Sequence, residues 1–508
     1  MLIHKIYQKI CSLSELDPEK IAFFEDNLIY TYLDFKNKIE CAIFQLKNTG
    51  ALPNDRIGLF IDNSFDAYCL IYACALSGLT YIPLPTEDPP LRIQTIVALA
   101  KISCIICAEK NSKKIISIYD SCVEPSKPKI LIFDPVENTK KIHFNFSNDI
   151  PLYMLFTSGS TGTPKGVLIH SAGVENFIFW AQSYLAINSN DLFLAHSRLT
   201  FDLSVFNLYL PFISGAAVRI VKSKADVIYP GSLLKKDVTI ALLVPRVTGL
   251  LLESEQLLND SYPKLRHLLF CGEKLFAAQA NAWIRTNKNL TLHNIYGPTE
   301  TTVTCTFQKL EPSQILNDPI PIGFAIPNMQ LNFLSDSNEI INGPTEGELI
   351  ISGVAVSLVD YCGQSSDRYF NHPLLGRCFK TGDIVKRNYL GQHFWITRID
   401  DQIKIRGFRV ELAEIEAVLF SHAGIIDLAC VFDPELQSLY IAVSLSDPSM
   451  HEKILKQLAD LCEKTLPTYM QPNEFVLFKK IPQNINGKAD KKKIKELVLE
   501  QKLNNKTI

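Results

Sequence analysis

The stretch Phe156–Val167, FTSGSTGTPKGV, holds three glycines, five hydroxyl residues and one lysine between two strand-like segments. Glycines let backbone N–H groups approach a ligand closely, hydroxyl groups donate further hydrogen bonds, and Lys165 adds positive charge. Such a loop suits phosphate. It differs from the Walker loop, which requires Gly-x-x-x-x-Gly-Lys-Ser/Thr before a helix. The alternative interpretation is a flexible surface loop without a ligand.

The chain around this loop alternates short apolar strands with helical patterns from about Asp55 onward. This alternation predicts mostly parallel sheets covered by helices. After about Gly297 the sequence becomes strand-rich with Pro and Gly punctuation, which predicts a β subdomain. From about Asp401 a hairpin, helices and strands indicate a compact α+β lobe. We therefore expect an α/β fold: a large N-terminal domain of mostly parallel sheets flanked by helices plus a β subdomain, and a small mobile α+β C-terminal domain.

Length and composition restrict the class of protein. The 508 residues exceed the size of a single hydrophobic core, and 47% hydrophobic with 20% charged residues is typical of a globular protein. The net charge of −2 argues against a nucleic-acid partner, which requires clustered basic residues. The apolar runs are too short to span a bilayer, and the N-terminus lacks the apolar core of a secretory signal. We expect a cytoplasmic protein.

The thirteen cysteines are odd in number and scattered, which favours free thiols in a reducing compartment. Cys104 and Cys107 have the spacing of a metal or redox pair. The surrounding ISCIICA predicts a short buried strand, however, and residues three apart on a strand point to opposite faces. A core role is therefore favoured over a metal or redox site.

Further short motifs lie before and after the loop, and together they span nearly the entire chain. They read YTYLDF, LSGLTYIPLPTEDPPLR, FDLSVF, NIYGPTETT, GELIISG, FKTGD, RIDDQIKIRGFRVELAEIE and INGKADKKKI. Together with the loop, they resemble the motifs of the ANL superfamily, which comprises acyl-CoA synthetases, adenylation domains of nonribosomal peptide synthetases, and luciferases. The resemblance implies an enzyme that uses ATP to convert a carboxylate to an acyl adenylate and then transfers the acyl group to a thiol.

The resemblance also implies a role for individual residues. Tyr296 would stack on adenine beside Asn294, Glu300 would hold Mg²⁺, and Asp383 would accept both ribose hydroxyls next to Arg398. Taken alone, Glu300 could be a solvated loop acid, and Asp383 a turn residue paired with an arginine. The implied nucleotide and magnesium contacts, among which Thr157, Glu300 and Lys488 are catalytic, are Thr157, Ser158, Gly159, Ser160, Thr161, Gly162, Lys165, Asn294, Tyr296, Gly297, Thr299, Glu300, Thr301, Asp383, Arg398 and Lys488.

Lys488 in INGKAD resembles the family's adenylation lysine. An anionic carboxylate that attacks an anionic phosphate needs positive charge where negative charge develops. The alternative is a solvated basic helix, because three more lysines follow at 491–493.

The domain division follows from the same resemblance. It implies an adenylation core at residues 1–397, a hinge at 398–400 centred on Asp400, and a lid domain at 401–508. After adenylation the lid would rotate, withdraw Lys488 and present the segment around Gly407 to the thiol. The sequence departs from the family pattern in two places: Thr397 stands where a Gly usually precedes Arg398, and Val356-Ser357 stands where Arg-Gly usually follows Gly-Val-Ala.

Asp202 in FDLSVF discriminates within the superfamily, because amino-acid-activating members carry Asp at this position. A buried α-ammonium group requires a paired countercharge. The alternative is an aspartate that caps the following helix. The corresponding substrate-binding residues are Asp202, Leu203, Phe206, Leu242, Leu269, Cys271, Ile295, Val303 and Thr304.

The predicted pocket walls carry no charge, so charged amino acids are poor candidates and a small or medium apolar amino acid is favoured. Cys271 in FCGE is similar to D-alanine:carrier-protein ligases, whereas Leu203, Leu269 and Val303 are similar to stand-alone prolyl-AMP ligases. Both possibilities stay open.

The acceptor thiol is expected on another molecule, because no carrier-protein motif follows Lys488 and no condensation motif occurs. We expect a separate phosphopantetheinylated carrier protein, with coenzyme A as the lesser possibility. The rival hypotheses are an acyl- or aryl-CoA ligase and a degenerate member that only binds nucleotide.

Overall fold

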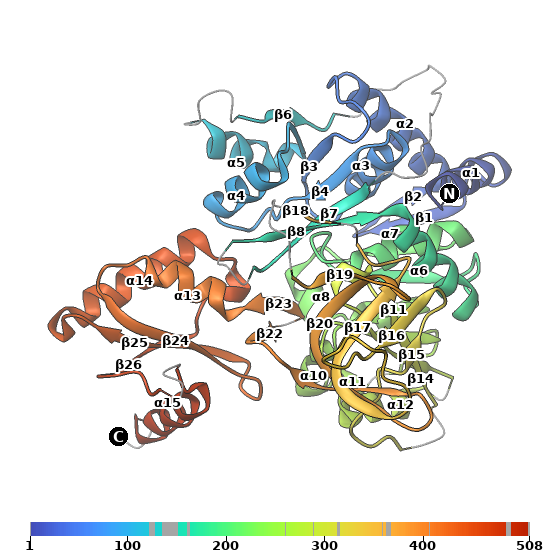
Figure 1. Cartoon of the computed structure of the whole chain (residues 1–508). Coiled ribbons are helices and arrows are strands. Elements are labelled where there is room, and N and C mark those ends of the chain that lie inside the picture. Colours follow the sequence, from blue (N-terminus) through green and yellow to red (C-terminus); the bar gives the residue numbers. More distant parts are fainter. Residues whose placement is uncertain are drawn as a thin grey trace. The chain divides into compact units, whose positions relative to one another are not determined.

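Figure 1 shows the computed structural model of the chain. The structure describes residues 2–120, 127–134, 151–159, 163–259, 261–287, 289–311, 315–357, 359–361, 367–405, 407–483 and 489–505. The chain divides into two compact units. The first comprises Met1–Thr86, Ala98–Leu155 and Gly166–Ile399, and the second comprises Glu87–Val97, Phe156–Lys165 and Asp400–Ile508.

A seven-stranded sheet has the order β18-β8-β7-β4-β3-β5-β6, and the pairs β3–β4, β3–β5, β4–β7 and β5–β6 are parallel. Its strands are β3 (Arg56–Phe60), β4 (Thr80–Pro83), β5 (Cys104–Cys107), β6 (Lys129–Ile132), β7 (Pro151–Thr157), β8 (Lys165–His170) and β18 (Val359–Tyr361). Both thiols of β5 are buried, and burial raises the pKa of each to about 11. This environment supports the predicted core role of Cys104 and Cys107.

A nine-stranded sheet has the order β15-β14-β13-β12-β11-β9-β10-β1-β2. Its six central strands are parallel, and only the edge pairs β1–β2, β13–β14 and β14–β15 are antiparallel. The strands are β1 (Ile21–Glu25), β2 (Leu28–Thr31), β9 (Leu192–Ala195), β10 (Ala217–Ile220), β11 (Ile240–Leu243), β12 (His267–Phe270), β13 (Thr291–Tyr296), β14 (Thr306–Leu310) and β15 (Phe324–Ala325). These sheets confirm the predicted α/β class.

Helices bury the apolar faces of these sheets. The largest core joins residues of both sheets to α1 (Leu2–Leu16), α2 (Tyr32–Lys47), α3 (Phe65–Leu76), α6 (Ser171–Tyr184) and α7 (Ser204–Ser214). Helix α7 is buried from Ser204 to Phe212, because almost every side chain in this stretch is apolar. Gly215 ends it at a φ of 73°, where a residue with a Cβ would be strained. A second core packs α10 (Pro245–Glu253) and α12 (Ala277–Thr286) on the nine-stranded sheet.

The predicted β subdomain is an antiparallel sheet with the order β16-β17-β20-β19, and β21 pairs with β20. Its strands are β16 (Met329–Asn332), β17 (Thr345–Gly353), β19 (Tyr369–His372), β20 (Gly376–Arg387) and β21 (His393–Arg398). The register places Asp383 of β20 directly opposite Arg398 of β21.

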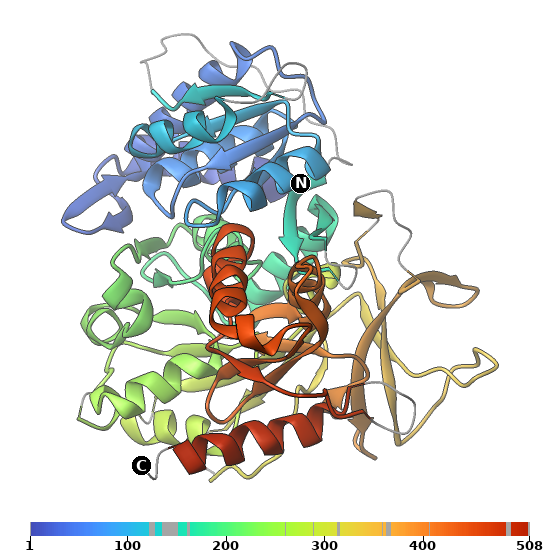
Figure 2. The same cartoon turned by 90° about the vertical axis from the view of Figure 1, so that its left-hand side faces the viewer.

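The second unit contains the predicted hairpin, β22 (Gln402–Ile405) and β23 (Phe408–Glu411), and a three-stranded sheet of β24 (Ile425–Asp433), β25 (Ser438–Leu445) and β26 (Glu474–Leu477). Alternate residues of the sheet enter two different cores. Leu428 and Cys430 pack with α13 (Leu412–Phe420) and α14 (His451–Thr465), whereas Ala429 and Val431 pack with α15 (Lys491–Asn505). The helices therefore cover opposite faces, as Figure 2 shows.

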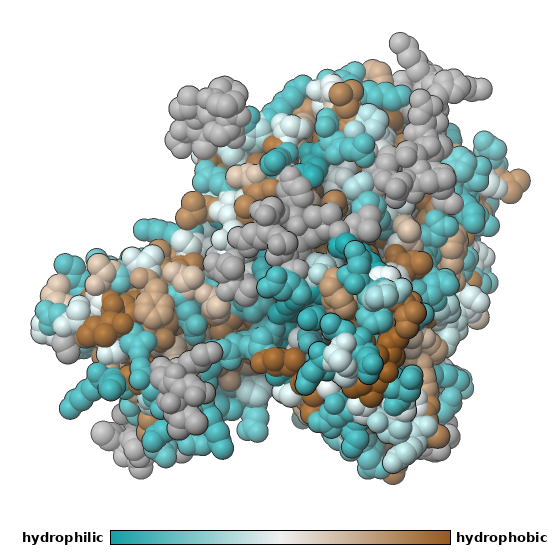
Figure 3. All heavy atoms as spheres, viewed as in Figure 1, coloured by the Kyte–Doolittle hydropathy of each residue, from teal (hydrophilic) through white to brown (hydrophobic). Residues whose placement is uncertain are grey.

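Hydrophilic residues cover most of the surface in Figure 3. Among the helices that the structure describes, none is long and apolar enough to cross a membrane.

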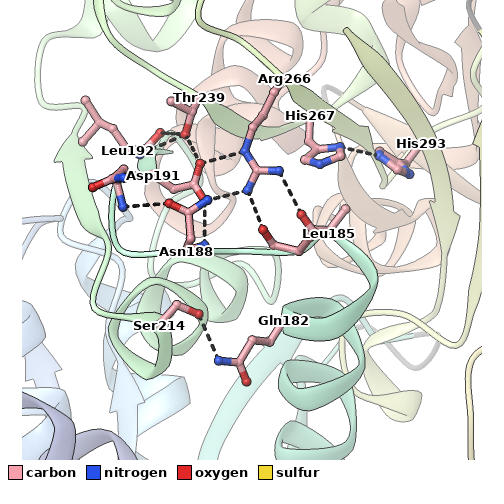
Figure 4. Close-up of polar contacts among 12 residues, drawn as sticks. Gln182, Leu185, Asn188, Asp191, Leu192, Ser214, Thr239, Arg266, His267 and His293 are labelled. Carbon is pink, nitrogen blue, oxygen red and sulfur yellow. Dashed lines mark hydrogen bonds and ion pairs between the residues drawn. The ribbon is translucent and has the colours of Figure 1, made fainter. Parts of the chain in front are cut away.

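An ion pair between buried Asp191 and half-buried Arg266 joins the end of α6 to the nine-stranded sheet (Figure 4). Arg266 donates to both oxygens of Asp191, over 2.8 Å to Oδ1 and 2.6 Å to Oδ2, and to the carbonyl of Leu185 over 2.9 Å. The hydroxyl of Thr239 and the backbone N–H of Asn188 also donate to this carboxylate. Burial alone would raise the pKa of Asp191, but these donors hold it below its usual value.

Beside this pair, Nδ1 of His267 lies 3.0 Å from Nε2 of His293 (Figure 4). Nδ1 of His293 lies 3.1 Å from the hydroxyl of Tyr184. Burial is the largest cause that lowers the pKa of His267 to about 4 and that of His293 to about 3. Both rings are therefore neutral at pH 7. His293 lies on β13, the strand that also carries Asn294 and Tyr296.

The neutral histidine pair predicts a loss of stability in acid. Because each folded pKa lies below the ordinary 6.5, the unfolded chain binds more protons as the pH falls. The stabilisation is fully present above pH 6.5 and declines towards pH 4. For His293 the loss between pH 7 and pH 5 is about 2 kcal/mol. Thermal unfolding of the wild type and of His293→Gln at both pH values measures it. The variant should lose less stability than the wild type, and an equal loss would contradict the assignment.

Candidate active site

Asp383 is the centre of a buried hydrogen-bond cluster in the first unit. Its side chain is 7% exposed, and Oδ1 accepts from Nη1 of Arg398 over 2.8 Å and from Nε1 of Trp395 over 2.9 Å. Oδ2 accepts from the hydroxyl of Tyr296 over 2.5 Å. Burial and the charge of Asp383 raise the pKa of Tyr296 well above its ordinary value, so its phenol stays protonated and donates. The structure thus brings together four residues from two sheets, and Trp395 is the one among them that was not predicted.

A β-bulge explains how Trp395 and Arg398 both reach Asp383. Residues three apart on a regular strand point to opposite faces. In β21, however, Thr397 pairs with Ile384 and Trp395 with the next residue, Val385, so Ile396 has no partner in the register. The extra residue reverses the alternation and turns Trp395 to the side of Arg398.

Hydrogen bonds also hold the backbone in place just before Asp383 and at Asp383 itself. The hydroxyl of Thr381 accepts from the backbone N–H of Asp383 over 3.0 Å and donates to the carbonyl of Leu349 over 2.8 Å. The N–H of Gly382 donates to Oε1 of Glu348 over 2.9 Å. These bonds to neighbouring β17 hold the carboxylate in one place before any ligand binds.

The segment after β13 is a tight turn. Residues Thr299–Thr301 form a single 3₁₀ turn, and a Cβ on Gly297 would lie 2.6 Å from the Cα of Thr304, so only glycine fits. Thr302 and Val303 adopt φ values of 59° and 65°, which β-branched residues rarely tolerate. The hydroxyl of Thr302 stabilises the turn by donating to the carbonyl of Ala355 over 2.9 Å. Strain of this kind is typical of functional sites.

Asn294 lies on β13 before this turn, and Glu300 is the middle residue of its 3₁₀ segment. Nδ2 of Asn294 donates to the carbonyl of Pro321 over 2.8 Å. Glu300 is buried at 7% exposure, and its carbonyl accepts from the N–H of Ser357 over 2.8 Å. Ser357 also contacts Tyr369 and Arg377, so the departure from the family pattern at this position is part of an ordered hydrogen-bond network.

Within the part of the chain that the structure describes, no three His, Cys, Asp or Glu side chains gather into a metal site. Mg²⁺ typically takes one or two carboxylates together with phosphates and waters. Buried Glu300 is therefore a chemically suitable donor for a magnesium ion that arrives with a nucleotide.

Asp202 lies at the start of α7 and is 5% exposed. Its Oδ2 accepts from the hydroxyl of Thr299 over 2.7 Å. The N-cap residue of α7 is Leu203, whose side chain makes no capping hydrogen bond, so the interpretation of Asp202 as the N-cap residue is wrong. Tyr153 is buried, and its hydroxyl has no hydrogen-bond partner among the described residues. Burial, and then the charges of Tyr81 and Asp202, raise the pKa of Tyr153.

The predicted pocket walls come together in one apolar core. They are Leu203, Phe206, Leu242, Leu269, Cys271, Ile295 and Val303, none of which is more than 2% exposed. Thr304 is also fully buried, and its hydroxyl donates to the carbonyls of Tyr296 and Thr306. The shared register of β11, β12 and β13 explains this clustering, since these strands are adjacent and parallel.

The phosphate loop begins where β7 ends, at Thr157, and β8 resumes at Lys165. Within the second unit, the hydroxyl of Ser158 donates to the carbonyl of Arg409 over 2.8 Å and accepts from the N–H of Glu411. The N–H of Gly159 donates to Oε2 of Glu414 over 3.1 Å.

Glu414 is 1% exposed and pairs with Arg92, so its contact with Gly159 belongs to a buried ionic cluster of this unit. Ser160, Thr161, Gly162 and Lys488 lie outside the described residues. The last segment of the second unit starts at Asp400, and the hinge role of this residue stays a prediction.

Comparison with known proteins identifies the family. Residues 14–359 match the model of the AMP-binding enzyme family, and residues 414–488 match that of the AMP-binding enzyme C-terminal domain. An L-proline--[L-prolyl-carrier protein] ligase of Streptomyces coelicolor is 30% identical over 489 residues, which cover 91% of each chain. Zwittermicin A synthase ZmaJ of Bacillus cereus is 28% identical over 494 residues, covering 94% of this chain and 91% of the relative.

Among solved structures, the Vibrio cholerae adenylation domain AlmE in complex with glycyl-adenosine-5'-phosphate has a TM-score of 0.87 at 23% identity. The match covers 98% of this chain and 97% of that one, and it confirms the fold. The resemblance found in the sequence motifs is confirmed as well: the chain belongs to the AMP-binding enzyme family.

Proposed function

We propose that the chain is an amino acid:carrier-protein ligase. Mg-ATP and an amino acid react to aminoacyl-AMP and pyrophosphate, and a thiol then takes the aminoacyl group as a thioester and releases AMP. The observation that carries the proposal is Asp202, a buried carboxylate beside an apolar cluster. A carboxylate in such surroundings is stabilised by a cation, and the α-ammonium of an amino acid supplies one.

The adenosine contacts follow from the cluster around Asp383. A carboxylate has about four lone-pair sites. Three are used by Arg398, Trp395 and Tyr296, so accepting two ribose hydroxyls requires one of these donors to move. Tyr296 is the candidate, because its proposed stacking on adenine would draw the ring away from Asp383.

The charge needed for the chemical step comes from two sources. Mg²⁺ bound through Glu300 and the nucleotide phosphates would stabilise the negative charge that develops during adenylation. Lys488 would contribute from the proposed lid domain at residues 401–508, which moves about the proposed hinge at 398–400 relative to the core at 1–397.

The substrate is a small or medium apolar amino acid. Support comes from the uncharged, fully buried walls and from the names of two similar proteins, a prolyl-carrier protein ligase and an adenylation domain with a glycyl adenylate. The name of the prolyl-carrier protein ligase also supports a separate phosphopantetheinylated carrier protein as the acceptor of the aminoacyl group. Coenzyme A is the alternative.

Amino-acid-dependent exchange of labelled pyrophosphate into ATP tests the proposal. A panel of the common amino acids, glycine and D-alanine should give exchange with one or a few small or apolar members, and only when Mg²⁺ is present. Exchange solely with fatty or aromatic acids would favour an acyl- or aryl-CoA ligase. If the purified chain formed no AMP from ATP with any carboxylic acid, the remaining hypothesis would be a protein that only binds nucleotide.

A further inference from the structure

Thr299 connects two parts of the site that are far apart in the sequence. It belongs to the YGPTE segment, in which Thr299 itself is expected to contact the nucleotide together with Tyr296, Gly297 and Glu300. Its hydroxyl nevertheless donates over 2.7 Å to Oδ2 of Asp202, which lies 97 residues earlier in the chain. The nucleotide segment therefore contacts the carboxylate that is expected to recognise the amino acid.

We propose that Thr299 is a positioning residue that orients the Asp202 carboxylate for the α-ammonium of the substrate. This inference rests on the proposed function. The hydrogen bond to Oδ2 restricts rotation of the carboxylate about its Cβ–Cγ bond. Oδ1 is then held at a defined angle to the apolar walls.

The position of Thr299 is itself fixed, which makes it a suitable support. It opens the 3₁₀ turn Thr299–Thr301, and the turn is followed by the strained Thr302 and Val303. The hydroxyl of Thr302 anchors these residues to Ala355. The orientation of Asp202 is thus set during folding, and binding of the amino acid does not have to fix it.

The surroundings strengthen the contact. Asp202 is 5% exposed and lies next to fully buried apolar side chains. Hydrogen bonds to a charged group are stronger than neutral ones, and a low local dielectric increases their strength further. Loss of the Thr299 hydroxyl should therefore weaken recognition of the ammonium by about 10-fold or more.

Thr299→Val tests the inference, because valine keeps the shape of threonine and lacks the hydroxyl. The ligands are non-hydrolysable sulfamate analogues of the glycyl and L-prolyl adenylates, each compared with the analogue that lacks the amino group. Calorimetry gives the Kd of the amino-free analogue and the Kd of the amino-bearing analogue. The ratio of the first Kd to the second measures recognition of the ammonium separately from binding of the nucleotide. The variant should lower this ratio about 10-fold, whereas Thr299→Ser should keep it.

Two further variants separate positioning from a merely structural role. In the background of Asp202→Asn, Thr299→Val should no longer change the ratio, because the two residues act through one contact. Thr302→Val removes the hydrogen bond that supports the turn but leaves the contact between Thr299 and Asp202 in place, so it should lower the ratio much less than Thr299→Val does. Thermal unfolding verifies that each variant is folded.

The outcomes distinguish this inference from the proposed function. If the wild type prefers the amino-bearing ligands and Thr299→Val retains the full preference, the positioning role is wrong while the function stands. If the wild type binds the amino-bearing and amino-free ligands equally, recognition of an α-ammonium fails, and the role of Thr299 fails with it.

Discussion

Asp202→Asn is expected to lower amino-acid-dependent pyrophosphate exchange by at least about 100-fold, because breaking a buried ion pair by removal of one partner costs about 3–5 kcal/mol. Asparagine keeps the size of the side chain and can still accept a hydrogen bond from Thr299, so the fold should persist. The loss should come mainly from the missing charge opposite the ammonium. Exchange assays over a range of amino-acid concentrations measure it as a fall in kcat/KM.

A neighbouring substitution provides the control. Ser204 lies two residues after Asp202 and is 4% exposed, but it belongs to no predicted site. Ser204→Ala should therefore keep the amino-acid dependence. If Asp202→Asn exchanged as fast as the wild type, the carboxylate would not recognise the ammonium.

Local patterns were sufficient for most of the fold. The alternation of strands and helices predicted parallel sheets, and β3, β4, β5, β6 and β7 form one. The strand-rich stretch after Gly297 predicted the β subdomain, and DQIKIRGFRV predicted the hairpin of β22 and β23. These elements are encoded by the spacing of apolar residues, which acts over only a few positions.

The contacts of the site depend on tertiary structure and could not be read in this way. Trp395 reaches Asp383 only because of a bulge, and neither periodicity nor a family motif indicates which residue of β21 is unpaired. The one signal in the sequence for a role of Trp395 was its aromatic side chain three residues before the motif arginine, Arg398. The contact of Asp202 with Thr299 joins two motifs whose proximity the sequence does not specify, and the helix begins one residue later than the capping hypothesis requires.

The family motifs predict which residues bind ligands, and these roles stay predictions, but the motifs do not indicate which protein groups contact these residues. Asp383 was expected to meet ribose hydroxyls, yet its oxygens already accept from protein donors. Ser158 and Gly159 were expected to meet phosphate, yet they bind Arg409, Glu411 and Glu414. Motif chemistry identifies a group that can bind a ligand, whereas the structure identifies the protein groups that form hydrogen bonds with it.

Asp383→Asn is expected to weaken ATP binding by about 100-fold or more and to lower the free energy of unfolding by about 3 kcal/mol. The amide has only one acceptor oxygen for the donors that now share the carboxylate. The charge of Arg398, whose side chain is 11% exposed, loses its partner. Calorimetric titration with Mg-ATP measures binding, and thermal unfolding measures stability. Glu348→Gln, which alters a carboxylate on the adjacent strand that contacts Gly382, should affect both quantities much less.

A double variant separates the two roles of Asp383. Arg398→Met in the background of Asp383→Asn removes the charge that Asp383 no longer balances, and an apolar side chain in its place should restore much of the lost stability. ATP binding should stay weak, because neither substitution supplies a carboxylate for the ribose. If the double variant bound ATP as tightly as the wild type, Asp383 would act only as the partner of Arg398, and the ribose would have to be bound elsewhere.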